Sequence, residues 1–171
     1  MRKLYIFVLV IFSQCIFSQT DARIYEIIES VSTKRIESDI RKLASFGTRN
    51  TFSDTISNKR GIGAARRWIK SEFEKVSKDC SNCLEVFYQK DFVTTNDGER
   101  VPKDTWIVNV VAVQKGTKNS NRYVIMTGDI DSRNSDPIDF TKDAPGANAY
   151  ATGMAGTIGA ARVLSTYSFD Y

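Results

Sequence analysis

The sequence predicts an α/β sandwich, in which helices cover an apolar sheet. Apolar residues recur at helical spacing in four segments, at about 21–31, 33–43, 62–77 and 152–166. Runs of β-branched and aromatic residues, which are typical of strands, stand at 84–95, 106–113 and 123–127. Helical segments on both sides of a group of apolar strands predict layers of helix packed on a sheet.

Length and composition are those of one soluble globular domain. The chain has 171 residues, of which 42% are hydrophobic and 26% are charged. A net charge of +4, spread along the chain, forms no basic patch, so we expect no nucleic-acid partner. The chain contains no histidine. Because zinc prefers histidine and cysteine as well as carboxylate, this composition argues against a catalytic zinc site.

Residues 1–19 have the pattern of a signal peptide, which leaves residues 20–171 as the mature domain. Arg2 and Lys3 precede an apolar stretch at 4–12 that is too short to cross a bilayer comfortably. We therefore expect a secreted or periplasmic protein with no membrane span after cleavage.

The cleavage point leaves two alternatives open. Ser18 is a small residue just before the expected cut. A lipoprotein signal ending at Cys15 is the competing interpretation, and Gln14 fits it poorly because glutamine is not small. An uncleaved anchor is the second alternative.

The first two helices are predicted from their apolar faces. Ile24 and Ile28 lie one helical turn apart in the first helix, which ends near residue 31. Ile40 belongs to the face of the second helix, and Ser32 or Thr33 is its expected N-cap.

The third helix follows a polar loop at 49–59 that has no periodicity. Its apolar residues share one face, and Arg66 and Arg67 are expected on the outside. Gly61 and Gly63 begin like the glycine motif of a dinucleotide-binding turn, but Arg66 takes the third glycine position and no strand precedes it. We therefore expect no nucleotide cofactor.

Cys80 and Cys83 form a C-x-x-C pair between the third helix and the first strand. In an exported protein this pair predicts a local disulfide that clamps the turn from helix to strand. A redox motif would place the pair at the start of a helix after a strand, which is the reverse order. A zinc knuckle would need two further ligands, and Cys15 leaves with the leader.

The three strands differ in pattern. Residues 84–95 alternate between apolar and polar side chains, and NDG at 96–98 is a turn signal. The run WIVNVVAV at 106–113 is apolar on both faces, which predicts a central buried strand. Residues 123–127 are predicted to form the next core strand, which ends at Gly128.

An acidic loop follows that last strand. Asp129 precedes it, and the loop itself carries Asp131, Asp136, Asp139 and Asp143. Acidic side chains delivered at the carboxyl end of a strand are a usual way for an open α/β sheet to build a site. The simplest interpretation is that the loop aspartates cap turns and face water, and weak calcium or magnesium binding through their oxygens is the alternative.

Several motifs in the mature chain share one resemblance. GDIDS stands at 128–132 and APGANAYATG at 144–153, and the stretches FGTR at 46–49, RGIGAARRWI at 60–69 and 101–111 accompany them. Together they resemble the co-catalytic di-zinc aminopeptidases, a secreted peptidase family that includes bacterial leucyl aminopeptidases and relatives of glutamate carboxypeptidase. In that family the first motif is Gly-His-x-Asp-Ser, and the second is Ala-Pro-Gly-Ala-Asn-Asp-Asp-Ala-Ser-Gly.

The resemblance implies a zinc-exopeptidase-like fold, a three-layer αβα sandwich around a mixed sheet, and it assigns roles to positions. Asp129 stands in the slot of the metal-binding histidine, and Ala149 stands in the slot of the metal-bridging aspartate. Tyr150 takes the neighbouring acid slot. Asp131 matches the aspartate that orients the metal-binding histidine in the family. Because position 129 holds an aspartate here, Asp131 has no histidine to orient.

The implied mechanism lacks several of its parts. The family's reaction uses two zinc ions that share a water, with a glutamate as general base. Its paired glutamates, a further carboxylate and a final histidine lie downstream of the segment that ends here at Tyr171, so we expect a chain truncated before the C-terminal half of the fold. We predict no intact catalytic residue, no zinc cofactor and no peptidase activity.

Three functions follow from this sequence. The first is an exported aminopeptidase-like protein without catalytic activity. The second is a non-catalytic module that holds a peptide or protein partner in the former substrate groove, with Arg133, Asn134, Asn148 and Tyr150 as candidate groove residues. The third is one half of a split metallo-aminopeptidase that another chain completes. In each case an unpaired, apolar sheet edge predicts poor solubility of the isolated chain.

Overall fold

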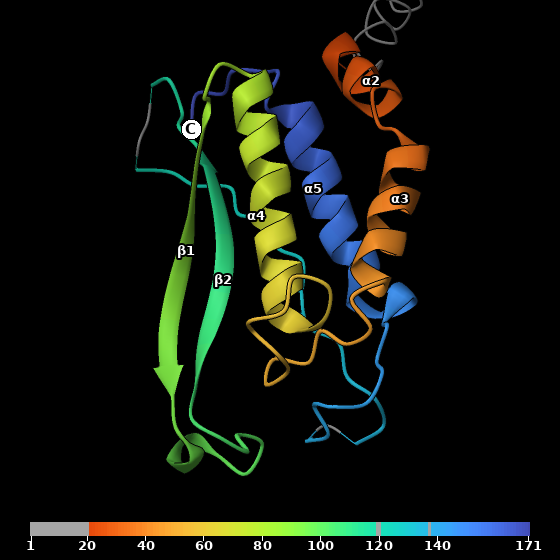
Figure 1. The fold of residues 1–171 in the computed structure, drawn as a ribbon. Coiled ribbons are helices and arrows are strands. Elements are labelled where there is room, and N and C mark those ends of the chain that lie inside the picture. The colour runs from red at the N-terminus through yellow and green to blue at the C-terminus, as the bar shows by residue number, and fades with distance from the viewer. Residues whose placement is uncertain (1–20, 119–120, 137) are drawn as a thin grey trace, which may run out of the picture. The chain divides into compact units, whose positions relative to one another are not determined.

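The computed structural model describes residues 21–118, 121–136 and 138–171 (Figure 1). The chain divides into two compact units, residues 1–30 and 31–171, which are described separately. The predicted signal peptide over residues 1–19, with Cys15, lies outside the described residues. Among the helices that are described, none is both long and apolar enough to cross a membrane.

The described part of the first unit is helix α2 (Ala22–Glu29), at the position that the sequence predicts. Asp21 caps its N-terminus, because its carboxylate accepts a hydrogen bond of 3.0 Å from the backbone N–H of Arg23. None of its residues is buried.

In the second unit, helix α3 (Thr33–Ala44) begins at the predicted cap. The Ser32 hydroxyl accepts a hydrogen bond of 3.3 Å from the Arg35 N–H. Beyond the helix the chain turns at Gly47, whose φ of +71° is a left-handed conformation that suits glycine.

The core of this unit lies where three helices meet. Helix α4 (Gly61–Asp79) packs against the β-hairpin, and helix α5 (Thr152–Leu164) lies between α4 and α3 (Figure 1). The buried cluster joins all three helices and consists of Leu43, Ile69, Phe73, Ala151, Met154 and Ile158. The periodic apolar faces of the sequence therefore do pack together, and the three predicted helices are confirmed.

Gly61 and Gly63 have a packing role in the structure. A Cβ atom on Gly63 would lie 2.2 Å from the backbone oxygen of Thr55, and one on Gly61 would lie 2.3 Å from that of Asp54. The two glycines thus let the first turn of α4 approach the loop before it. The same helix corrects one expectation, since Arg66 is buried, with 8% of its surface exposed, rather than on the outside.

The sheet is an antiparallel pair of strands. Strand β1 (Leu84–Val93) pairs with strand β2 (Thr105–Gln114) in a register that sets Leu84 opposite Gln114 and Val93 opposite Thr105. A short 3-10 turn, η2 (Thr95–Asp97), stands at the predicted turn signal. Val86, Val110 and Ala112 pack against the helical core from one face of the hairpin.

Two predictions about the sheet are wrong. Residues 123–127 are predicted to be a core strand, but they belong to no strand, and Val124 and Ile125 are 80% and 81% exposed. No residue of β2 is buried, although its sequence predicts a central strand. The physical reason is the same for both segments. A strand needs hydrogen-bonded neighbours on its edges and cover on its faces, and the described residues supply β2 with one neighbour and residues 123–127 with none.

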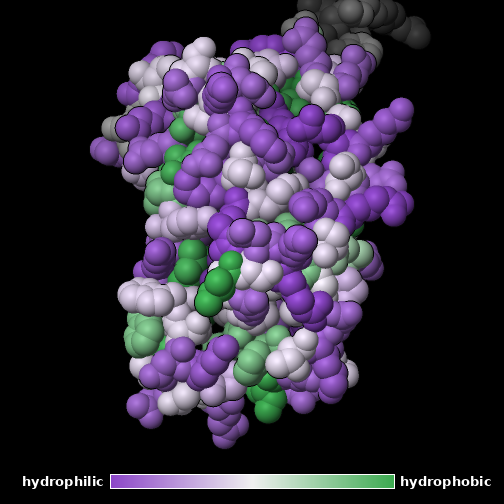
Figure 2. All heavy atoms as spheres, viewed as in Figure 1, coloured by the Kyte–Doolittle hydropathy of each residue, from purple (hydrophilic) through white to green (hydrophobic). Residues whose placement is uncertain are grey.

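The predicted α/β class is confirmed, but the predicted three-layer sandwich is not. The described residues are a mixture of helix and strand, as an α/β fold requires, with the helices of the second unit on one face of the hairpin (Figure 1). A third layer and a larger mixed sheet are not part of the described structure. On the face seen in Figure 2, hydrophobic side chains form small separate patches among polar ones.

Candidate functional site

The first motif lies at the end of the extended segment that precedes the acidic loop. Asp129, in the histidine slot, is exposed, whereas Asp131 is half-buried. Burial raises the pKa of Asp131, the neighbouring Asp129 carboxylate raises it further, and Arg133 opposes the rise. The two carboxylates therefore share one electrostatic environment at the carboxyl end of this segment.

Arg49 joins the first motif to the second. Its Nε donates 2.8 Å to the carbonyl oxygen of Ile130, between the two aspartates. Its Nη1 donates to the carbonyls of Leu43 (2.9 Å) and Pro145 (2.7 Å), and its Nη2 donates 3.1 Å to that of Gly146. The side chain is fully buried, and burial lowers its pKa to about 10 against the opposing effect of Asp131. Arg49 thus remains a cation at neutral pH and cross-links both motif loops to the end of α3.

Ser132 completes this connection. Its hydroxyl accepts a hydrogen bond of 2.9 Å from the Arg49 N–H and donates to the carbonyl of Ala144, while its own N–H donates 3.2 Å to the Arg49 carbonyl. The Ala144 N–H in turn donates 2.8 Å to Gly47. Ser132 is therefore a buried structural residue, which agrees with its lack of a histidine partner for catalysis.

The second motif forms the irregular turn η3 (Ala147–Ala151), which leads into α5. Gly146 has a φ of +46°, and a Cβ atom there would lie 2.7 Å from that of Ser132. Tyr150 has a φ of +68° and a ψ of −39°, a positive-φ conformation that is unfavourable for a tyrosine. Ala149, in the bridging-aspartate slot, is exposed and offers no ligand atom.

The three aspartates in the later part of the loop, Asp136, Asp139 and Asp143, each have a structural partner. Asp136 accepts from the Ile138 N–H at 3.1 Å, and Asp139 accepts from the N–H groups of Thr141 and Lys142. The hydrogen bond from the Lys142 side chain, helped by these turn contacts, lowers the pKa of Asp139 well below its usual value. The remaining loop acid pairs with a cation, as Asp143 lies 2.6 Å from Arg60. These contacts favour the turn-capping interpretation over a calcium or magnesium site.

The four candidate groove residues lie on these same loops. Arg133, Asn148 and Tyr150 are exposed, and Tyr150 retains 37% of its surface. Asn134 is half-buried and donates 3.4 Å to the carbonyl of Asp139. Arg133, Asn148 and Tyr150 are thus accessible to a ligand. Asn134 instead makes a hydrogen bond within the acidic loop.

The residues of the motif loops do not fit a pair of zinc ions. Asp129 and Asp131 offer carboxylates, but Ala149 offers nothing, and the chain has no histidine. Nowhere among residues 21–118, 121–136 and 138–171 do three histidine, cysteine, aspartate or glutamate side chains come together. Zinc sites usually use three or four such ligands, and the two motifs supply only the carboxylates of Asp129 and Asp131.

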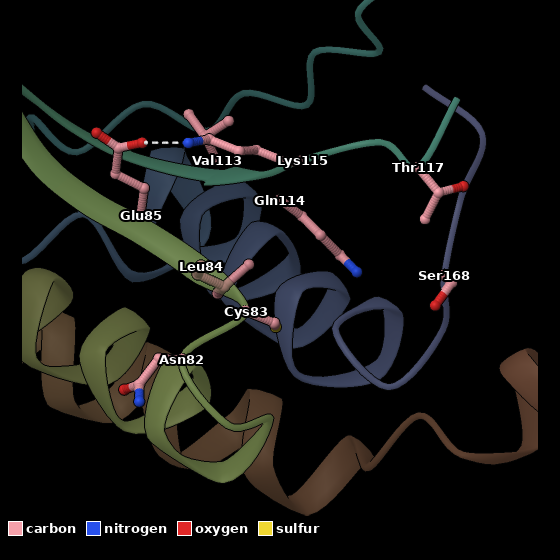
Figure 3. A pocket seen from close by; sticks show the side chains of 9 residues that line it. All are labelled: Asn82, Cys83, Leu84, Glu85, Val113, Gln114, Lys115, Thr117 and Ser168. Carbon is pink, nitrogen blue, oxygen red and sulfur yellow. Dashed lines mark ion pairs between the residues drawn. The ribbon is translucent and has the colours of Figure 1, made fainter. Parts of the chain in front are cut away.

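The C-x-x-C pair stands apart from the motif loops. Cys80 and Cys83 are bonded as a disulfide, with their Cα atoms 5.5 Å apart, at the turn from α4 to β1. Cys83 lines an open cleft of about 350 Å³ between the start of β1 and the end of β2, where Lys115 pairs with Glu85 (Figure 3). No residue of the two motifs lines this cleft, so it is not the candidate site.

Comparison with known proteins finds several probable zinc metalloproteases that are similar to this chain. The chain is 41% identical over 147 residues to a probable zinc metalloprotease of Pyrenophora teres f. teres, a match that covers 86% of this chain and 32% of the relative. It is 38% identical over 147 residues to a probable zinc metalloprotease of Pyrenophora tritici-repentis, with 86% and 34% covered. A probable zinc metalloprotease of Phaeosphaeria nodorum is 36% identical over 159 residues, with 86% and 32% covered.

These relatives support a zinc metalloprotease family for the chain. The chain spans about a third of the length of the curated relatives that it matches. No protein-family model matches it, and no solved structure matches it. The relatives' names give the metal and the protease class and do not specify which peptide bonds are cleaved.

One residue of the site is not singled out by the sequence. Arg49 belongs to the FGTR stretch that carries the resemblance, but its pattern gives no hint of burial, because arginine is usually exposed. The available signal was its position, directly after a helix and within a motif that resembles a peptidase. Its four carbonyl acceptors come from segments up to 97 residues away.

Proposed function

We propose that this chain is an exported relative of the zinc aminopeptidases that has no peptidase activity of its own. The family class is supported by the probable zinc metalloproteases that it resembles over most of its length. The single observation that carries the loss of activity is the pair of substituted slots. Asp129 and Ala149 stand on loops whose hydrogen-bonded frame is otherwise complete.

The chemical reason lies in what zinc does in such a site. A bridging carboxylate holds two metal ions at a fixed separation, and a general base takes the proton from their shared water. Asp129 keeps a possible oxygen ligand, but the exposed methyl group of Ala149 cannot bridge. Zinc affinity is therefore expected to be too low for hydroxide formation at neutral pH.

The test combines metal content and activity of the purified chain lacking residues 1–19. We expect well under one equivalent of zinc after equilibration with zinc and gel filtration, and no chelator-sensitive hydrolysis of leucine p-nitroanilide. The double variant Asp129→His, Ala149→Asp, which restores both slots, is the matched control and should retain more zinc than the parent. Two tightly held equivalents of zinc in the parent chain, with turnover that a chelator abolishes, would overturn the proposal.

A second candidate function, binding of a peptide in the former substrate groove, is favoured by Tyr150. The positive-φ backbone at this position (φ +68°, ψ −39°) is sparsely populated and costs on the order of 1–3 kcal/mol for a residue other than glycine. Strain of this kind persists most often at functional sites. The exposed ring stands on the same loops as Arg133 and Asn148.

Tyr150→Gly separates binding from stability. Glycine accepts a positive φ, so the free energy of unfolding should rise by about 1 kcal/mol. If the ring holds a peptide, the same change should remove the signal on a peptide array that the parent chain gives. Tyr150→Phe is the control, which keeps the ring and should keep the signal. A parent chain without any array signal, or a signal that survives in Tyr150→Gly, would rule out this use of the ring.

Completion by a second polypeptide is the third candidate. The coverage of about a third of the relatives leaves room for the remaining ligands to come from another segment. Ala149 counts against it, because the bridging ligand is lost in the part that is present.

A further inference from the structure

We propose that Arg49 is the positioning residue of the candidate site: its guanidinium sets the separation of the two motif loops without any metal ion. The inference rests on the proposed function only in taking these loops as the ligand-bearing loops of a peptidase-like site. The roles that the resemblance assigns fall on the slot residues themselves, and none falls on Arg49.

The geometry of the hydrogen bonds carries this inference. Ile130, whose carbonyl accepts from Nε at 2.8 Å, lies between Asp129 and Asp131 in the first motif. Gly146, whose carbonyl accepts from Nη2 at 3.1 Å, lies three residues before Ala149 in the second. One planar cation therefore spans both loops, and the fork of a guanidinium fixes the angle as well as the distance between its acceptors.

Burial makes this connection strong. Arg49 is fully buried, and its acceptors are backbone carbonyls, so no carboxylate hydrogen-bonds to its guanidinium in the described structure. A buried cation is tolerated only when its donors are satisfied, and here four carbonyl dipoles satisfy them. The loops cannot move apart without leaving Nε or Nη2 without an acceptor.

The backbone on the second loop is shaped to admit the guanidinium. A Cβ atom on Gly146 would lie 2.7 Å from Cβ of Ser132 and 3.1 Å from Nη2 of Arg49, so only glycine lets this loop approach both residues, and its carbonyl accepts from that nitrogen at 3.1 Å. Ser132 adds a second connection through the Arg49 backbone. The frame of the site is thus a property of the protein chain, which explains how it persists where the metal ligands have been replaced.

The experiment measures the separation of the two slots directly. Nitroxide labels are placed at Asp129 and Ala149 through cysteine substitutions, with Cys15 removed together with residues 1–19 and the Cys80–Cys83 disulfide left intact. Dipolar electron paramagnetic resonance then gives the distribution of distances between the labels. We expect a narrow distribution in this parent and one that is about twofold broader after Arg49→Lys, because an ammonium group cannot hold both loops in one plane.

Arg67→Lys is the matched control. Arg67 also donates to backbone carbonyls, those of Thr55, Ile56 and Ser57, but it is exposed and does not touch the motif loops. The distance distribution should be unchanged in this variant. Amide exchange gives a second readout: in Arg49→Lys the N–H groups of Ser132 and Ala144 should exchange faster, while those of α4 keep their protection. A merely stabilising role would accelerate exchange throughout the unit.

A further variant covers the case in which Arg49→Lys fails to fold, as judged by circular dichroism. Gly146→Ala keeps Arg49 but places a methyl group 2.7 Å from Cβ of Ser132 and 3.1 Å from Nη2 of Arg49, so the second loop must shift from both and the same broadening is expected. An unchanged distance distribution in the folded variants, or equal broadening in Arg67→Lys, would overturn the proposal. Neither outcome involves zinc or hydrolysis, so either would leave the proposed function untouched.

Discussion

Replacing Arg162 by methionine is expected to lower the free energy of unfolding by about 3–5 kcal/mol. Arg162 lies on α5, and its guanidinium pairs with Asp39 on α3 and Glu72 on α4. The Nη2 atom lies 2.8 Å from Oε2 of Glu72 and 3.2 Å from Oδ1 of Asp39. Methionine fills a similar volume but leaves two carboxylates buried without this cation.

The magnitude follows from burial. The three side chains are 15%, 7% and 9% exposed for Arg162, Asp39 and Glu72, so water cannot replace the lost partner without opening the helix packing. Removal of one member of a buried ion pair costs more than the pair itself contributes, because the remaining charge stays desolvated. Lys75, whose Nζ lies 2.6 Å from Oε1 of Glu72, softens the loss at that residue only.

The dependence on pH gives this prediction a second signature. Burial alone would raise the pKa of Glu72, but hydrogen bonds from Lys75 and Arg162 lower it below its ordinary value of 4.5. Since the folded pKa lies below the unfolded one, this stabilisation is present above pH 4.5 and is lost as the pH falls through the folded value. Without Arg162 the lowering is smaller, so the difference in stability between parent and variant should shrink on acidification below that pH.

The measurement is urea denaturation of both proteins at pH 7 and at pH 4. Arg41→Met on α3 is the control, because Arg41 pairs with Glu37 on the surface, where 77% and 62% of the side chains are exposed. Exposed pairs of this kind contribute at most about 1 kcal/mol. A loss in Arg162→Met no larger than that in Arg41→Met at pH 7 would contradict the prediction.

This ion-pair network also shows what sequence patterns leave out. The helices that carry Asp39, Glu72 and Arg162 are predicted correctly, since their apolar faces repeat every three to four residues. The three charges are separated by up to 123 residues, and periodicity treats each as a solvated surface residue. Only the packing of α5 between the other two helices brings them together, and that packing is a tertiary property.

In the candidate site, too, the sequence predicts the motif positions but not the contacts that depend on tertiary packing. The slots at Asp129 and Ala149 are visible in the sequence because a motif has fixed spacing. The part played by Arg49 depends on carbonyl groups, which every residue has and which no pattern distinguishes. The strand predictions differ for a related reason: residues 106–113 do form a strand but not a buried central one, and residues 123–127 form none. Apolar β-branched runs are typical of strands covered on both faces, and the described residues cover one face of β2 and neither face of residues 123–127.

The segment around residues 123–126 leads to the second large effect, which is association of the isolated chain. Tyr123, Val124, Ile125 and Met126 are 76%, 80%, 81% and 57% exposed. Four consecutive exposed apolar residues with high strand propensity and no strand partner are a template for pairing between chains. The double variant Val124→Lys, Ile125→Lys should raise the concentration of soluble monomer on the order of tenfold, because charge on such a segment blocks edge pairing.

Sedimentation velocity at several protein concentrations tests this expectation, with Ile56→Lys as the control. Ile56 is 88% exposed, but it stands alone in a polar loop, so its replacement removes a similar apolar area without removing a strand template. The comparison therefore separates strand pairing from general hydrophobicity: pairing predicts an effect at residues 124 and 125 alone, whereas hydrophobicity predicts a similar effect at Ile56. A parent chain that stays monomeric at high concentration would show that the exposed segment is held away from other chains, and the apolar run would then need a different explanation.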